Sequence, residues 1–143
     1  MDWLGSLAVV LIGAVLAHCL AIRRSKLTAR RTAAAKFRGS ILATLNGLYP
    51  LPVNWPDDID HTLRRAFPTL QTAIAEFRPF VPWRRRWAYD RAWFHYRCST
   101  GRHVDIQCHH HYMDFRSPDE SPTDAKSTFH ENVSALLAFA ATT

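Results

Sequence analysis

Residues 3–22 read WLGSLAVVLIGAVLAHCLAI, and this stretch decides how the rest of the chain is organised. It contains no Asp, Glu, Lys or Arg. An α-helix rises about 1.5 Å per residue, so these twenty residues would be about 30 Å long, the thickness of a bilayer's hydrocarbon core. The stretch therefore predicts one transmembrane helix, and we interpret residues 1–22 as a membrane anchor.

A cluster of positive charge follows the apolar stretch directly. Seven of the 18 Lys and Arg residues precede residue 51, where the only acid is Asp2, whereas the remainder of the chain is balanced at eleven of each sign. Each Lys or Arg beside anionic lipid is worth about 1 kcal/mol, and such residues stay on the cytoplasmic side. We therefore expect anionic headgroups as a partner, the N-terminus outside and the C-terminal part in the cytoplasm. The expected membrane-interface residues are Arg23, Arg24, Lys26, Arg30 and Arg31.

A cleaved signal peptide is the alternative interpretation of residues 1–22. Signal peptides carry positive charge before their apolar core. Here Asp2 precedes the core and the positive residues follow it, which is the reverse order. The order of charges favours a retained anchor.

Residues 23–49 continue with the spacing of an amphipathic helix. Neither Gly nor Pro occurs between the apolar stretch and Gly39, so the anchor and this helix are compatible with one continuous rod. Asn46-Gly47 and Pro50 predict its end. Its apolar stripe either packs on the protein's own domain, which we favour, or forms a dimer contact. The stripe consists of Leu27, Ala34, Phe37, Ile41, Leu45 and Leu48.

Residues 50–143 predict a small helical domain. Asp57, Asp58 and Asp60 suit the start of a helix through Phe77, which Pro68 would kink or split. A further helix is expected from Trp83 to about Cys98, after Pro82, and a last one begins at the capping sequence of residues 121–124. The fold class is therefore all-α, with one N-terminal transmembrane helix followed by a small cytoplasmic helical domain.

The helix expected from Trp83 carries aromatic side chains on two faces. Helical spacing puts Trp83, Trp87, Phe94 and Cys98 on one face and Tyr89, Trp93 and Tyr96 on the other. One face would pack on the domain core and the other on the bilayer interface or on a partner. Arg86 and Asp90 are expected to pair. The predicted partner-binding residues are Trp83, Trp87, Tyr89 and Trp93.

Arginines interleaved with aromatic residues, as at residues 83–87, also occur in proteins that bind nucleic acids. The balanced charge of the chain after Pro50 argues against nucleic acid as a partner.

Histidine and cysteine residues gather after this helix. His95, Cys98, His103 and Cys108 have the ligand chemistry of a tetrahedral zinc site, although their spacing matches no standard zinc module. The alternative is a solvated connector rich in histidine, which includes residues 109–111. Zinc is the single cofactor that the sequence suggests. No catalytic motif is present, so we do not expect an enzyme.

Three phrases carry a resemblance to known proteins: RRTAAAKFRGSILATLNGLYP at residues 30–50, AIAEFRPFVPWRRRWAYDRAWFHY at 73–96 and FHENVSALLAFA at 129–140. Together, behind one N-terminal span, they resemble a group of small single-pass membrane proteins of bacterial, often prophage-linked, genomes. The resemblance implies a location in the bacterial inner membrane and supplies no catalytic residues.

The expected function is a membrane-tethered, non-enzymatic interaction module. The resemblance implies that it modulates a host membrane protein or interferes with a phage entering the cell, and its partner would be an unidentified membrane protein or a second copy of itself. One alternative is a self-assembling protein that perturbs the bilayer, since Gly5, Ser6, Gly13 and Ala14 offer small faces for helix contact. The other is a zinc-binding sensor or enzyme.

Overall fold

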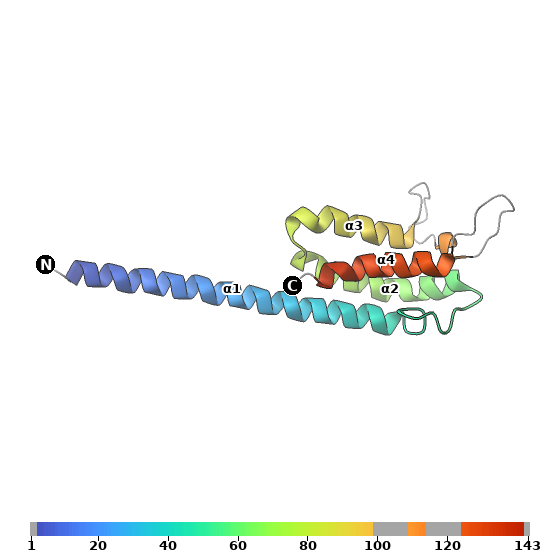
Figure 1. Cartoon of the computed structure of the whole chain (residues 1–143), viewed down its shortest axis with the longest axis horizontal. Helices are drawn as coiled ribbons and strands as arrows, with labels where there is room; N and C mark the ends of the chain where they lie inside the picture. Colours follow the sequence, from blue (N-terminus) through green and yellow to red (C-terminus); the bar gives the residue numbers. More distant parts are fainter. Residues whose placement is uncertain (1–2, 99–108, 114–123, 142–143) are drawn as a thin grey trace. The chain divides into compact units, whose positions relative to one another are not determined.

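The computed structural model describes residues 3–98, 109–113 and 124–141, with side chains from Gly13 onward except that of His110 (Figure 1). All the regular structure in these residues is helical, which confirms the all-α fold class. The chain divides into two units, Met1–Thr32 and Ala33–Thr142, which are described separately.

Helix α1 (Trp3–Thr44) begins in the first unit and continues without interruption into the second. The predicted anchor and the basic stretch after it are therefore parts of one helix. Every described side chain from Gly13 to Ala29 is exposed. Leu27, which we expected in the buried stripe, is 55% exposed, so the stripe begins later than its sequence spacing suggested. Among the helical residues that the structure describes, no helix combines the length and the apolar character that crossing a bilayer requires.

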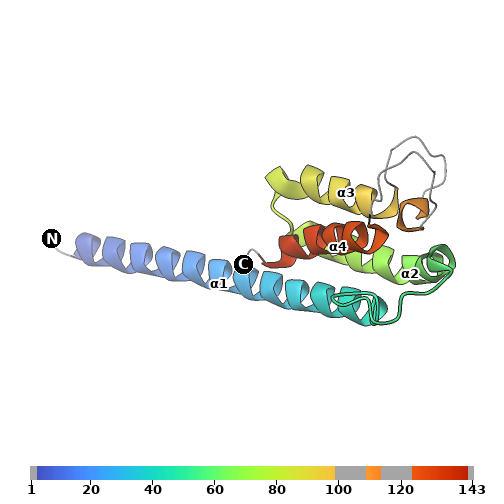
Figure 2. The ribbon, with the colours of Figure 1, turned by 45° about the vertical axis from the view of Figure 1, so that its right-hand side comes forward.

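The second unit is a bundle of antiparallel helices (Figures 1 and 2). The last turns of α1 are followed by α2 (Ile59–Phe77), α3 (Trp83–Arg97) and α4 (Ala125–Ala141), and each runs opposite to the one before it. Helices α2 and α4 lie between α1 and α3 in both views. Two short 3₁₀ helices, η1 (Arg78–Phe80) and η2 (His110–Tyr112), adjoin α2 and α4.

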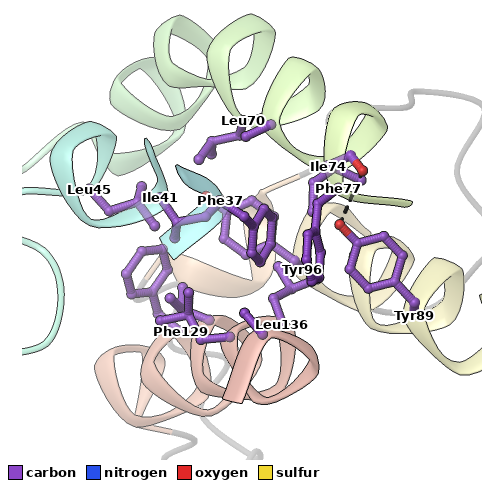
Figure 3. Packing of buried hydrophobic residues seen from close by; sticks show 14 of the residues in the cluster. Phe37, Ile41, Leu45, Leu70, Ile74, Phe77, Tyr89, Tyr96, Phe129 and Leu136 are labelled. Atoms are coloured by element: carbon purple, nitrogen blue, oxygen red, sulfur yellow. Dashed lines mark hydrogen bonds between the residues drawn. The ribbon is translucent and has the colours of Figure 1, made fainter. Parts of the chain in front are cut away.

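Aromatic side chains from all four helices meet in the core of this unit (Figure 3). The ring of Phe37 stacks on that of Phe77, with centroids 4.7 Å apart, and lies 6.3 Å from Tyr89. The stripe is buried from Ala34 to Leu48, so it packs on its own domain, as we favoured, although Leu45 and Leu48 lie in the turn after α1, which ends at Thr44. Its buried members are Ala34, Phe37, Ile41, Leu45 and Leu48.

Aspartates cap the starts of α2 and α4, and α4 begins at Ala125, later than the predicted start within residues 121–124. A side-chain oxygen of Asp58 accepts a hydrogen bond of 2.9 Å from the backbone N–H of His61 at the start of α2. Asp124 accepts from the backbone N–H of Lys126 at 3.1 Å and starts α4 in the same way. The other predicted cap residues, 121–123, lie outside the described residues. Gly47 has φ +84°, a conformation that glycine adopts without strain, just after α1 ends.

Pro68 lies inside α2, which stays one helix of 19 residues. The sequence left open whether this proline would split the helix. Phe67, directly before it, and Leu70, two residues after it, are buried in the core. Burial of the whole apolar face of α2 therefore outweighs the one backbone hydrogen bond that a proline removes.

Candidate functional site

The exposed face of α3 is the most unusual surface of the second unit. Trp83 is 74% exposed and Trp87 is 70% exposed, although tryptophan is normally well buried. The guanidinium carbon of Arg84 lies 5.2 Å from the ring centre of Trp83, and that of Arg91 lies 5.2 Å from the ring of Trp87. We call Trp83, Arg84, Trp87 and Arg91 the α3 surface.

The turn before α3 is fixed by two arginines. Arg86 donates from its Nε to the carbonyl oxygen of Val81 and from an Nη to that of Pro79, both at 3.2 Å. Arg78 makes two bonds to the Asp90 carboxylate, at 2.8 and 2.7 Å. The predicted pair of Arg86 with Asp90 is therefore wrong, because Arg78 approaches Asp90 from the preceding turn and Arg86 binds backbone oxygens.

Arg78 also changes the acidity of its partner. Its hydrogen bonds and positive charge hold the pKa of the Asp90 carboxyl below its usual value, with a smaller contribution from the charge of Arg86. Asp90 is thus ionised and neutralised by Arg78. Because Asp90 pairs with Arg78, it does not neutralise the positive charges of Arg84 and Arg91 on the α3 surface.

The opposite face of α3 lies in the core. Tyr89, which we predicted to bind a partner, is fully buried and donates from its hydroxyl to the carbonyl oxygen of Ile74 at 3.1 Å (Figure 3). Trp93, also on our list, is half-buried and its ring stacks on Phe67 and Tyr96, with centroids 5.6 and 5.4 Å apart. The prediction for Tyr89 is corrected by its burial, because aromatic spacing alone does not say which face of a two-sided helix is covered, and that for Trp93 stays a prediction.

The predicted zinc ligands are only partly described. His95 is exposed and its Nε2 accepts a bond of 3.2 Å from Arg91 Nε, whereas Cys98 is buried. The two described ligands therefore do not present their donor atoms at one surface. His103 and Cys108 lie outside the described residues. In the part of the chain with assigned positions, no group of three His, Cys, Asp or Glu residues is arranged to hold a metal ion.

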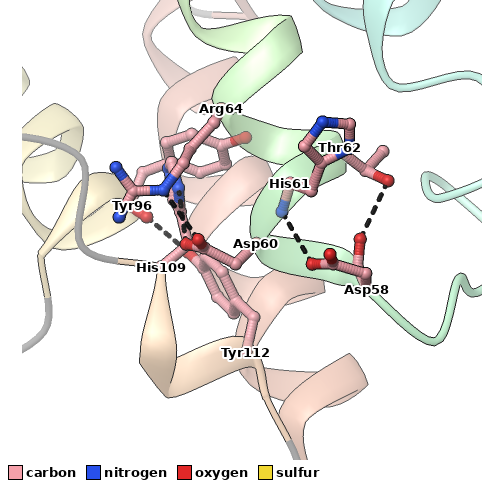
Figure 4. Close-up of polar contacts among 8 residues, drawn as sticks. All are labelled: Asp58, Asp60, His61, Thr62, Arg64, Tyr96, His109 and Tyr112. Atoms are coloured by element: carbon pink, nitrogen blue, oxygen red, sulfur yellow. Dashed lines mark hydrogen bonds and ion pairs between the residues drawn. The ribbon is translucent and has the colours of Figure 1, made fainter.

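A buried polar cluster that the sequence did not suggest lies at the end of α2 near residue 60 (Figure 4). His109 is fully buried, and its Nδ1 lies 3.8 Å from Oδ1 of Asp60. The other carboxylate oxygen of Asp60 accepts a bond of 2.6 Å from Arg64 Nε. The ring of His109 stacks parallel to that of Tyr112 at 6.3 Å. No spacing rule distinguishes His109 from its two histidine neighbours, so only the tertiary structure reveals it.

Tyr112 joins the segment of His109 to the bundle. Its hydroxyl donates to the carbonyl oxygen of Tyr96 at 2.8 Å and accepts from Asn132 Nδ2 at 3.0 Å. The segment of residues 109–113 therefore contacts α2 at Asp60 and hydrogen-bonds to α3 at Tyr96 and to α4 at Asn132. This arrangement stabilises the fold by tying three helices together.

A hollow of about 500 Å³ next to this cluster is lined in part by Trp55, Asp58 and Tyr112. Its polar groups already serve the fold, since Asp58 caps α2 and the Trp55 ring lies 5.9 Å from the Lys126 ammonium. The hollow therefore offers a ligand few unused groups.

The predicted membrane-interface residues lie on α1 in the first unit. Arg23, Arg24, Lys26 and Arg31 are exposed, and Arg30 is half-buried. Their exposure is compatible with contact to headgroups.

Comparisons with known proteins give no relative: no family model matches the chain, and no similar curated protein or solved structure was found.

Proposed function

We propose that this protein is a single-pass, non-enzymatic interaction module of the bacterial inner membrane. Residues 1–22 are its anchor, and the second unit is a helical domain on the cytoplasmic side. The observation that carries the proposal is the exposure of apolar side chains around the first unit's helix.

No face of this part of the helix carries a charged residue. Val15, Leu16, Leu20 and Ile22 are between 42% and 60% exposed on one half of it, and residues 3–22 contain no Asp, Glu, Lys or Arg on any side of the axis. A helix that is apolar all round requires an apolar surrounding, whereas one that packs on a single neighbour has a single apolar stripe. Burying one Val, Leu or Ile side chain gains about 1.5–3 kcal/mol, so a bilayer around this segment would be strongly favoured.

The charges beside this segment support both its proposed position in the bilayer and the proposed side of the membrane for the second unit. Arg23 and Arg24 come directly after Ile22 and are exposed, so they suit the headgroup region. Lys and Arg follow the segment and do not precede it in this sequence, and this order of charge favours the second unit on the cytoplasmic side.

The α3 surface is the binding surface in this proposal. Exposed tryptophan and arginine are the residue types most enriched where proteins bind other molecules. A domain held at a membrane can bind membrane partners for which its affinity is low, because tethering raises the effective concentration of those partners.

Fractionation of cells that produce the tagged full-length chain tests the anchor. We compare the native chain with the variant Val15→Arg/Leu16→Arg and with a matched control, Thr28→Arg/Ala29→Arg, which adds the same charges beyond the predicted span. An arginine inside a span costs about 3 kcal/mol, so only the first variant should appear in the soluble fraction. The native chain and the control should stay with the membrane after an alkaline carbonate wash. Release of the native chain by carbonate would contradict the proposal.

A further inference from the structure

We propose that the α3 surface docks on the anionic headgroup region of the same membrane that holds the anchor. The inference rests on the proposed function and names the partner of its binding surface. Trp83, Arg84, Trp87 and Arg91 would make this second contact with the bilayer.

The four side chains form one continuous face. Trp83, Trp87 and Arg91 follow each other at steps of four residues, and Arg84 lies three residues before Trp87, so all project from the same side of α3. Tryptophan prefers the boundary between headgroups and acyl chains, where its apolar ring and its N–H group both find suitable surroundings. A guanidinium matches the geometry of a lipid phosphate and binds it through two parallel hydrogen bonds.

The charge of the face fits an anionic surface. Neither Arg84 nor Arg91 forms an ion pair with any residue that the structure describes. The nearest acid on α3, Asp90, is neutralised by its two bonds to Arg78. The face therefore presents two uncompensated positive charges between exposed aromatic rings, and anionic phosphates complement them.

The start of α3 lies at the end of the second unit where the chain enters it. Within the second unit, Phe37 lies one turn after Ala33, where the chain joins this unit, and its ring contacts Phe77 and Tyr89. The start of α3 is thus at the same end of the bundle as the chain's point of arrival. Ile22 and Ala33 are eleven residues apart, about 16 Å of helix. An anchor this close in the chain raises the effective concentration of headgroups around the second unit.

Quenching of tryptophan fluorescence in proteoliposomes tests the docking. The full-length chain is reconstituted in phosphatidylcholine vesicles with or without phosphatidylglycerol, and part of the phosphatidylcholine is brominated near its carbonyl groups. Native protein is compared with Trp83→Phe/Trp87→Phe, which removes the two fluorophores and keeps aromatic rings on the exposed face. Of the chain's five tryptophans, Trp3, Trp83 and Trp87 would contact lipid, so the variant should lose about two thirds of the quenching in anionic vesicles.

Charge variants give the matched comparison. Arg84→Gln/Arg91→Gln should lower quenching in anionic vesicles to the level of zwitterionic vesicles, whereas Arg65→Gln, an exposed arginine on α2, should leave it unchanged. Equal quenching in the native chain and in Trp83→Phe/Trp87→Phe would overturn the inference. So would blue-shifted emission that depends on the protein-to-lipid ratio without quenching, because the face would then bind a second copy. Flotation of the vesicles separates the two proposals: protein that fails to float refutes the anchor, and protein that floats without quenching at α3 refutes only the docking.

Discussion

Three tyrosines bring hydroxyl groups into the core of the second unit. Tyr89, Tyr96 and Tyr112 are at most 1% exposed. Burial raises the pKa of each phenol above its ordinary value of 10, because the charged form is poorly solvated there. Their side chains fill the space between helices, and Tyr89 and Tyr112 also bind backbone oxygens of α2 and α3.

These pKa shifts predict a loss of stability at alkaline pH. Above the ordinary tyrosine pKa of 10, the unfolded chain releases phenolic protons that the folded chain retains. The contribution of the tyrosines to stability is therefore constant below that pH and falls as the pH rises toward the higher folded values, by about 1.4 kcal/mol per pH unit for each tyrosine. Denaturant unfolding of the full-length chain in detergent, followed by near-ultraviolet circular dichroism, measures this slope.

The variant Tyr112→Phe provides the comparison for the alkaline slope. It should lower stability at neutral pH by about 1–3 kcal/mol, because two hydrogen bonds are lost, and it should show a shallower decline above the tyrosine pKa. An unchanged slope in this variant would show that Tyr112 titrates normally in the folded state.

At the scale of elements, α1 contains two parts with different surroundings. From Gly13 to Ala29 its described side chains are exposed, and from Ala34 onward one stripe is buried in the bundle. Leu27 and Phe37 continue the same heptad-like spacing in the sequence, yet only Phe37 has helices packed around it.

Alanine substitutions should separate these two parts of α1. Phe37→Ala removes a ring that is 2% exposed and should cost about 3–5 kcal/mol of unfolding free energy. Leu27→Ala should change it by less than about 0.5 kcal/mol, because that side chain is exposed. Denaturant unfolding monitored by the aromatic circular dichroism of the bundle measures both, and Phe37→Leu serves if the alanine variant fails to fold. Equal losses would mean that Leu27 is also part of the packed domain.

The sequence predicts local features of these elements better than their contacts. The apolar spacing of Ile59 to Phe77 and the cap at Asp58 were sufficient to predict α2, because both depend on residues within a few turns. The pairing of Asp90 with Arg78 was not predictable in this way, since both Arg78 and Arg86 lie within reach in the sequence and only the turn between α2 and α3 selects one.

The same limit applies to the candidate site. The aromatic spacing of α3 indicated two aromatic faces. Which face is buried, with Tyr89, and which is exposed, with Trp87, depends on where α2 and α4 lie. His109 is buried through contacts with Asp60 and Tyr112. Asp60 is distant from it in the sequence, and the proximity of Tyr112 in the sequence does not by itself indicate a contact. Burial of individual side chains is a property of the assembled helices, so periodicity alone leaves it open.

At the scale of the whole molecule, the two units differ in what surrounds their apolar side chains. The second unit buries its apolar residues among its own helices, from Ala34 on α1 to Ala140 on α4. The described apolar residues of the first unit, such as Leu16 and Leu20, are exposed. A bilayer around the first unit would bury its apolar side chains as well. This membrane anchor is the central element of the proposed function.

Collision measurements on nitroxide labels in the reconstituted full-length chain test this anchor most directly. Cys19 is exposed on α1 and accepts a label once Cys98 and Cys108 are replaced by alanine; the matched site is Leu27→Cys in a chain that also carries Cys19→Ala. A membrane anchor predicts that the label at residue 19 collides mainly with lipid-soluble oxygen, whereas the label at residue 27, among the basic residues that follow the span, collides mainly with a water-soluble nickel complex. Equal collision with the nickel complex at both sites would contradict the anchor.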